Sequence, residues 1–301
     1  MAMTPDAYVS TRKVGAAEVT LLLEGYGPYP VDLNVPEEVW RPEVPEADAA
    51  GNVVIATGGA YIRLGGASIV VDPGLDDPDS PAAPVVETVF QGWTFTPGMQ
   101  AGLEQIGVQP EAVDYVLITH AHFDHCLGLT TLRGGAEAPR FPNARYLLDA
   151  ADWAMHFGPD DTPHPLPPSP FVAVNDDMRR RLLHIRKAGL LDLVTGDVAV
   201  VPGLEFIPAP GESPGHRAVR LESDGAVFWH LGDIAHYAVE FSHLDWLAPR
   251  RRDPVAMEAT RRAIFPRLVA EDALVAWSHA PFPSWGHVVA DGEGYRWVGG
   301  R

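Results

Sequence analysis

The chain has 301 residues and a formal net charge of −18, from 22 Lys and Arg against 40 Asp and Glu. Such an excess of acidic residues repels phosphate backbones and acidic membrane surfaces, so we expect neither nucleic acid nor a membrane as a partner. The single cysteine excludes an intramolecular disulfide. No signal-peptide pattern opens the chain and no window approaches about 18 continuous apolar residues. We therefore expect a cytoplasmic protein with a large core, folded as one domain over residues 1–301.

The N-terminal part lacks a clear period. Residues 24–52 mix Pro, Gly, acids and aromatics without alternation. We expect about the first 52 residues to form an arm that wraps the domain and lines a pocket or a homodimer interface.

A β-hairpin is predicted next. Two apolar segments, 60–64 and 67–71, flank Gly65-Gly66, which is typical of a two-residue turn between antiparallel strands. Asp72 follows the second strand directly, so its carboxylate should emerge at the end of that strand.

The most informative segment is the cluster His120-Ala121-His122-Phe123-Asp124-His125, which directly follows the apolar strand 115–119. Imidazole nitrogen and carboxylate oxygen are donors that Zn²⁺ and similar ions favour. Four donors exceed what one open site uses, so the spacing indicates two adjacent ions that share further ligands. A buried strand would deliver the cluster to a sheet edge, where open α/β sheets build their sites. Cys126, next in the chain, could bind metal, but we interpret it as a small buried hydrophobe.

The middle of the chain contains a proline-rich segment, 158–170. It cannot form a helix or a central strand, because proline lacks the amide donor and fixes φ. We expect an ordered lid or a tether. Asp176 as a capping acid and the helix formers after it predict a short helix over 176–183. Asp253-Pro254 is typical of an N-cap before a helix that begins with proline, and Pro266 is expected to end or kink this helix.

Three more donors follow apolar strands. His216 comes after a strand-like segment and a Ser-Pro-Gly turn, Asp233 after a strand that ends at Gly232, and His279 directly after a third strand. Isolated histidines at such places are usually satisfied loop residues. The upstream cluster is what makes these three residues candidate metal ligands, with Asp233 as the natural bridging carboxylate.

Taken in order, Asp72, the cluster of residues 120–125, His216, Asp233 and His279 resemble the five motifs of the metallo-β-lactamase superfamily, over nearly the whole chain. The resemblance implies an α/β fold of the αββα type, in which two mixed sheets pack face to face between outer helices, with metals at one edge. In the residues that make up these motifs, the chain is most similar to the branch that contains bacterial lactonases and methyl parathion hydrolase.

The resemblance also implies a ligand set. One ion would be held by His120, His122 and His216, the other by Asp124, His125 and His279, and Asp233 would bridge both. Asp72 would support a ligand imidazole by a hydrogen bond rather than bind metal. Several true β-lactamases have Cys at the bridging position, so the carboxylate argues against antibiotic hydrolysis. The cofactors implied are two divalent ions; zinc is expected, with manganese, cobalt or iron as alternatives.

The function implied is a hydrolase that uses a metal-bridging hydroxide to cleave a small neutral lactone or carboxylic ester, with Asp124 and Asp233 as the catalytic carboxylates. The alternatives are an organophosphate triester hydrolase, a mononuclear-iron oxidoreductase of the sulfur-dioxygenase type and a non-catalytic metal-binding sensor. His236, Tyr237 and His287 are candidates for contacts with a ligand or with the substrate, and their spacing does not select among them.

Overall fold

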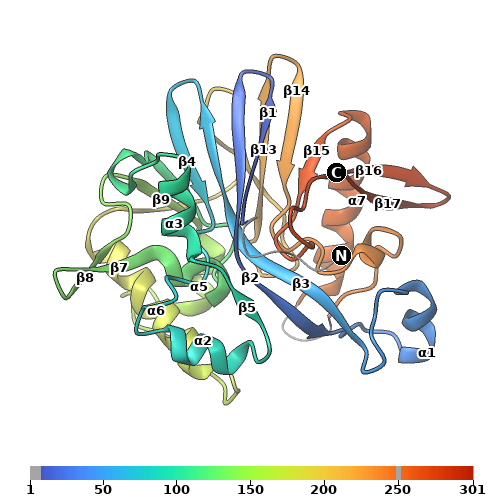
Figure 1. The fold of residues 1–301 in the computed structure, drawn as a ribbon, viewed down its shortest axis with the longest axis horizontal. Helices are drawn as coiled ribbons and strands as arrows, with labels where there is room; N and C mark the ends of the chain where they lie inside the picture. Colours follow the sequence, from blue (N-terminus) through green and yellow to red (C-terminus); the bar gives the residue numbers. More distant parts are fainter. Residues whose placement is uncertain (1–7, 249–251, 301) are drawn as a thin grey trace.

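Two β-sheets stacked face to face form the centre of the molecule, as the computed structural model shows for residues 8–248 and 252–300 (Figure 1). The first sheet has the strand order β1-β2-β3-β4-β6-β9-β10, with β5 paired to β2. Its strands are β1 (Val9–Val14), β2 (Ala17–Pro30), β3 (Asn52–Leu64), β4 (Ala67–Val71), β5 (Thr94–Phe95), β6 (Tyr115–Leu117), β9 (Arg145–Asp149) and β10 (Leu191–Val194).

The second sheet has the order β11-β12-β13-β14-β15-β16-β17. Its strands are β11 (Val198–Val201), β12 (Leu204–Pro208), β13 (Arg217–Ser223), β14 (Ala226–His230), β15 (Leu274–Ala276), β16 (Gly286–Asp291) and β17 (Gly294–Gly299). Each sheet is mixed, because β4, β6, β9 and β10 run parallel in the first and β14 and β15 in the second. A separate hairpin joins β7 (Thr130–Arg133) and β8 (Ala136–Pro139).

Helices cover both outer faces. The first sheet is covered by α2 (Ala83–Val89), α3 (Gly98–Gln105), α5 (Ala150–His156) and α6 (Val172–Lys187), and the second by α7 (Pro254–Ala270) (Figure 1). The short helices are α1 (Glu37–Trp40) and α4 (Phe123–Cys126), with 3₁₀ turns η1 (Arg41–Glu43), η2 (Pro110–Ala112), η3 (Leu127–Leu129) and η4 (Ala238–Phe241). The expected αββα fold is confirmed.

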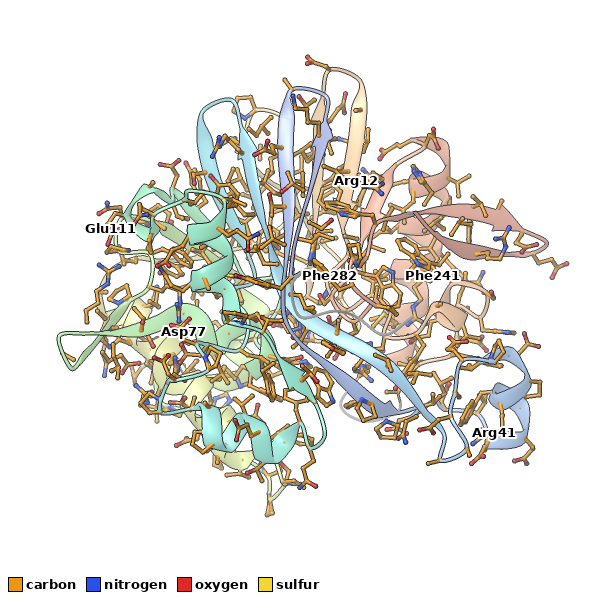
Figure 2. The ribbon with its side chains drawn as sticks, in the orientation of Figure 1. Arg12, Arg41, Asp77, Glu111, Phe241 and Phe282 are labelled. Atoms are coloured by element: carbon orange, nitrogen blue, oxygen red, sulfur yellow. The ribbon has the colours of Figure 1, made fainter. Side chains whose placement is uncertain are left out.

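Alternation along the strands explains the layers. In β4, Ile69 and Val71 point into the core between the two sheets, whereas Val70 faces the helices. All three side chains are fully buried, so this strand is apolar on both faces. Figure 2 shows the interior filled by side chains, with Phe241 in the layer between the second sheet and α7 and Arg41 at the periphery.

The predicted hairpin is confirmed. Leu64 pairs with Ala67 across Gly65 and Gly66, and both glycines have positive φ (57° and 89°), which a two-residue turn of this type requires.

The expected N-terminal arm is wrong for residues 9–30. This segment forms β1 and β2, and β2 pairs with β3 from Glu18 to Pro30. The alternation of apolar and polar residues is not visible in β2 because aromatic rings occupy the space where two of its side chains would lie. A Cβ on Gly25 would lie 2.9 Å from the Phe95 ring, and one on Gly27 would lie 2.3 Å from the Trp93 ring. Residues 31–51 do lie outside the sheets and pack, through α1, against η4 and Trp246. Residues 1–7 lie outside the described part.

The helix predictions are partly right. Asp253 caps α7 as expected, because its carboxylate accepts hydrogen bonds from the backbone N–H groups of Val255 and Ala256, both at 3.0 Å. Pro266 does not end this helix, which continues to Ala270. The predicted helix over 176–183 exists, but it begins four residues earlier, and Asp176 lies inside it.

The proline-rich segment 158–170 has neither helix nor strand, as expected. Among the described residues, no helix is both long and apolar enough to cross a membrane.

Candidate metal centre

The predicted donors meet at one edge of the sandwich because neighbouring strands end there. Parallel strands β4 and β6 deliver Asp72 and the cluster of residues 120–125, and parallel strands β14 and β15 deliver Asp233 and His279. A Cβ on Gly232 would lie 2.6 Å from His216 Nε2, so this turn reaches His216 only with glycine.

Asp124, His125 and His279 form one group of donor atoms, all within 4.8 Å of one another. Asp124 Oδ2 lies 3.8 Å from His125 Nε2 and 3.7 Å from His279 Nε2. The other ring nitrogens are fixed from behind: His125 Nδ1 lies 2.9 Å from the Asp72 carboxylate and His279 Nδ1 lies 3.0 Å from the carbonyl oxygen of Ala56. These contacts at Nδ1 direct both Nε2 atoms toward the group, as ligand imidazoles require.

His120 and His122 face a second position, with His120 Nε2 and His122 Nδ1 at 2.8 Å. The His216 ring lies 5.1 Å from the His120 ring, and its Nδ1 lies 3.0 Å from the Ala209 carbonyl oxygen. His216 Nε2 accepts the backbone N–H of Asp233 at 2.9 Å. His216 therefore lies beside the site, but backbone groups engage both of its ring nitrogens, so no lone pair is left for a metal ion, which corrects the expected ligand role.

The Asp233 carboxylate lies between the two positions. Its Oδ1 is 3.4 Å from His125 Nε2, and its Oδ2 is 3.7 Å from His120 Nε2 and 3.1 Å from His279 Nε2. Asp233 Oδ1 and His125 Nε2 are both buried and have no hydrogen-bond partner. Because buried polar atoms are normally satisfied, a divalent cation fits this gap and would satisfy both atoms.

Charges around the site favour a cation. Burial opposes the charged form of Asp233, but the imidazoles of His279, His125 and His236 hold its pKa well below the usual range. Burial likewise opposes protonation of His279, but Asp233 and Asp124 raise its pKa to about 9. Burial and the neighbouring histidines lower the pKa of His120 well below its usual range, which keeps this imidazole neutral. The carboxylates thus create a negative potential that a metal ion can neutralise.

Asp72 connects both groups. Its carboxylate accepts the backbone N–H and the hydroxyl of Thr119, each at 2.7 Å, and contacts His125 Nδ1. The Thr119 hydroxyl lies 3.1 Å from His120 Nδ1. One fully buried carboxylate therefore orients a histidine of each group, directly or through a hydroxyl.

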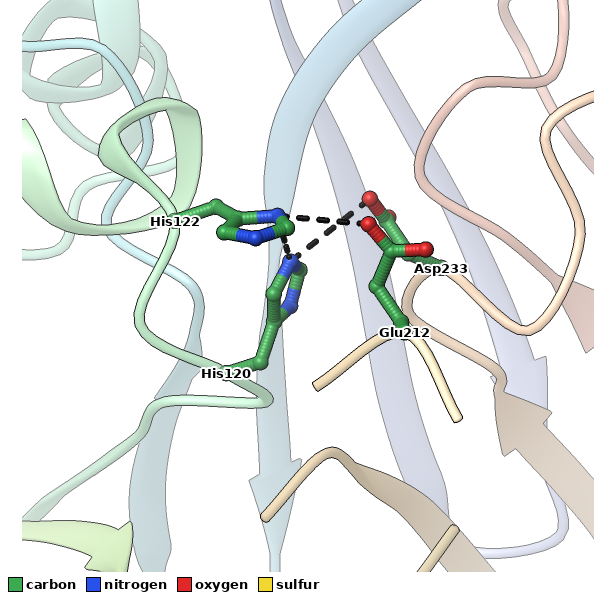
Figure 3. Close-up of side chains that lie close together, drawn as sticks. All are labelled: His120, His122, Glu212 and Asp233. Atoms are coloured by element: carbon green, nitrogen blue, oxygen red, sulfur yellow. Dashed lines mark hydrogen bonds and ion pairs between the residues drawn. The ribbon is translucent and has the colours of Figure 1, made fainter. Parts of the chain in front are cut away.

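Two buried acids at the site are not predicted from the sequence. Glu212, four residues before His216, is buried, and its Oε1 lies 3.3 Å from His122 Nδ1 (Figure 3). Asp152 on α5 is fully buried and accepts the backbone N–H groups of Ala121 at 2.6 Å and Gly215 at 2.7 Å, so it ties together two donor-bearing loops. Glu212 carried a weak signal, an acid beside the Ser-Pro-Gly-His turn, whereas Asp152 carried none, because acids in a first helical turn are common.

Arg252 is the partner of Glu212. Its Nε donates to Glu212 Oε2, and its Nη2 lies 2.9 Å from His236 Nε2. Burial alone would raise the pKa of Glu212, but Arg252 and the nearby histidines lower it to about 2. The Glu212 side chain is therefore a carboxylate throughout the physiological pH range.

The three further candidates separate clearly. His236 lies in the site, with Nε2 at 3.2 Å from Asp233 Oδ2 and its ring stacked on that of His279 at 4.8 Å. Tyr237 is structural in this geometry, since its hydroxyl donates to the Pro30 carbonyl oxygen at 3.0 Å and accepts the Asp32 N–H at 3.3 Å.

His287 is not brought into the site, which corrects the expectation for this residue. It lies in the β16–β17 hairpin opposite Val298, half-exposed, with Asp272 as a charged neighbour at 3.7 Å. Strand β16 begins at Gly286, and this fixes His287 on the hairpin rather than on a loop over the metal positions.

Cys126 is fully buried within the core between the first sheet and its helices, as expected for a small hydrophobe.

Four aromatic residues, which we call the aromatic row, lie beside the cluster of residues 120–125. Phe123 lies 5.8 Å from Phe90 and 6.0 Å from Phe171, and Phe90 lies 4.3 Å from Trp93. Phe171 directly follows the proline-rich segment, so that segment ends at the aromatic row beside the site.

The sequence matches a known family model and several known proteins. Residues 60–279 match the family model described as "Metallo-beta-lactamase superfamily". An N-acyl homoserine lactonase from Bacillus cereus is 25% identical over 187 residues, which are 57% of this chain and 60% of that protein. An N-acyl homoserine lactonase from Bacillus thuringiensis is 26% identical over 125 residues, 40% of this chain and 38% of that protein. The chain therefore spans less than two thirds of these relatives.

Solved structures show the same fold. One described as hydrolase AbOPH in the beta lactamase superfamily has a TM-score of 0.80 at 22% identity and covers 98% of both chains. AidC, described as a dizinc quorum-quenching lactonase, has a TM-score of 0.78 at 17% identity and covers 97% of both chains. At these identities the likeness concerns the fold.

Proposed function

Because the chain belongs to the metallo-β-lactamase superfamily, we propose that it is a hydrolase that binds two divalent metal ions and cleaves a small neutral lactone or carboxylic ester. The observation that carries this proposal is the pair of donor groups on either side of the Asp233 carboxylate, together with the buried Asp233 Oδ1 and His125 Nε2 atoms, which have no hydrogen-bond partner. Donor groups at two neighbouring positions favour hydrolysis over the mononuclear-iron oxidoreductase and over a non-catalytic sensor.

The residues divide the chemistry between them. His120 and His122 would hold one ion, Asp124, His125 and His279 the other, and Asp233 both. Ions bound there would supply a water molecule with a pKa near 7 and a Lewis acid for the substrate oxygen.

Asp124 is the carboxylate best placed to move a proton. Its side chain is 12% exposed, against 2% for Asp233, so it can contact both the site and an arriving substrate. Burial and the charge of Asp124 raise the pKa of Tyr29, on β2, so this hydroxyl keeps its proton and is available to donate to a substrate oxygen.

Three features support the substrate class. Around the buried Phe90, the partly exposed side chains of Trp93, Phe123 and Phe171 suit an acyl or other hydrophobic group beside the donor cluster. The net charge of −18 disfavours polyanions. The similar curated proteins are named N-acyl homoserine lactonases.

Purified protein is expected to contain about two transition-metal ions per chain, mainly zinc, because donor groups lie on both sides of the Asp233 carboxylate. Element analysis of protein prepared without chelator measures this directly. One tightly bound iron without a second ion would instead support the oxidoreductase.

Turnover is expected with acyl-homoserine lactones or aryl esters, and not with phosphodiesters or β-lactams. A panel of these substrates with phosphotriesters, under one set of metal conditions, tests the class. Slower phosphotriester hydrolysis is compatible with the proposal, since the same activated water can attack phosphorus. Activity confined to phosphodiesters or β-lactams contradicts it.

A further inference from the structure

We propose that Glu212 is a metal ligand at the position of His120 and His122, so that this position has a carboxylate of its own besides the shared Asp233. This inference rests on the proposed dinuclear site. The set of four donors is visible in Figure 3, where the two imidazoles and the two carboxylates point toward one another.

The distances suit a shared ion. The donor atoms of His120, His122, Glu212 and Asp233 all lie within 4.8 Å of one another. Two ligand atoms about 2.0–2.1 Å from a tetrahedral ion lie roughly 3.3 Å apart. Glu212 Oε1 and His122 Nδ1 are separated by 3.3 Å. A shared proton can bridge only two of these atoms, whereas a metal ion can coordinate all four.

The burial of Glu212 also favours a metal ion at this position. The Glu212 side chain is 1% exposed, and a buried carboxylate is costly unless it is paired or coordinates a metal. Arg252 binds the Oε2 atom, which leaves Oε1 directed at His122. Arg252 also contacts His236 and the carbonyl oxygen of Ala248, so the guanidinium is held in place from three sides.

Arg252 is therefore a positioning residue for Glu212. By fixing one oxygen it presents the other as a single, monodentate ligand. Its positive charge also balances the added carboxylate, so that the extra ligand does not change the net charge around the metal positions. The chain in this way offers four donors to the first position: His120, His122, Asp233 and Glu212.

The decisive variant is Glu212→Gln, which keeps the size of the side chain and an oxygen for Arg252 but removes the negative charge. The matched control is Asp76→Asn, because Asp76 is also a buried carboxylate paired with arginines, Arg140 and Arg181, and it belongs to none of the metal-binding groups. Circular dichroism confirms that each variant is folded, and Glu212→Asp, which keeps the charge with a shorter reach, is a second test.

The readouts are metal content after dialysis against graded chelator and the visible absorption of the Co²⁺-substituted protein. We expect Glu212→Gln to weaken one of the two ions at least tenfold and to change the Co²⁺ spectrum, while Asp76→Asn changes neither. Two ions of unchanged affinity and an unchanged spectrum in Glu212→Gln contradict the ligand role. Weaker binding with an unchanged spectrum also overturns it, because that result means a hydrogen bond to a ligand. Wild-type protein that binds no metal contradicts the proposed function itself.

Discussion

Replacing His279 by alanine is expected to remove one of the two ions and to lower kcat/KM by about 10²–10³-fold, the scale of losing a group that stabilises developing charge. His279 follows the buried strand β15 and is 5% exposed. Its Nε2 faces both Asp233 and Asp124, and its Nδ1 is anchored on the Ala56 carbonyl oxygen. Alanine leaves an open coordination position and two carboxylates without their partner.

His287→Ala provides the matched control. This histidine stands eight residues later and is chemically identical, but its side chain is 44% exposed and its charged neighbour is Asp272. We expect both ions to remain and activity to stay within about twofold, since surface substitutions usually change free energies by less than about 0.5 kcal/mol. Element analysis and kcat/KM on the same preparations decide the matter. Loss of metal in His287→Ala with retention in His279→Ala would falsify the assignment.

Donors at strand ends were predictable from the sequence because their positions follow from covalent neighbours. A short apolar run followed at once by Asp72, His120 or His279 indicates a buried strand whose end must lie at a sheet edge. Strand pairing then places these edges together without any further information. This is why the local pattern and the resemblance located the same strand-end donors, whereas His216, which follows a turn, has both ring nitrogens engaged by the backbone.

What the sequence could not predict depends on contacts between distant segments. Glu212 matters because Arg252, forty residues away, contacts one oxygen and His122 lies beside the other. Asp152 matters because two loops direct backbone N–H groups at it. Strand β2 was missed because Phe95 and Trp93 occupy the space above its glycines. None of these partners is visible in the local pattern of the residue concerned.

Glu24 provides the largest expected effect on stability. This residue of β2 is 3% exposed and lines a cavity of about 40 Å³. Its Oε2 accepts the backbone N–H of Leu75 at 2.8 Å, whereas its Oε1 has no hydrogen-bond partner. Burial, opposed only in part by the Leu75 N–H and Arg140, raises the pKa of Glu24 to about 8. Leu75 lies three residues after Asp72, so this carboxyl group supports the loop that orients His125.

The sign of the pH dependence follows from linkage. The folded pKa of about 8 lies above the ordinary value of 4.5, so the folded state holds a proton that the unfolded state releases between these two values. The contribution of Glu24 to stability is fully present below pH 4.5 and is lost as the pH rises toward 8. The gap corresponds to roughly 4–5 kcal/mol as an upper bound.

Glu24→Gln is therefore expected to match the wild type within about 1 kcal/mol near pH 4.5 and to be more stable by a few kcal/mol at pH 8–9, because the amide keeps the shape and cannot ionise. The free energy of unfolding of both proteins, from denaturant titrations at pH 5, 7 and 9 with equal metal loading, measures the difference. Glu87→Gln is the control, since Glu87 lines the same cavity from α2 but is exposed. A stability difference for Glu24→Gln that stays constant from pH 5 to pH 9 would show that Glu24 does not titrate in this window.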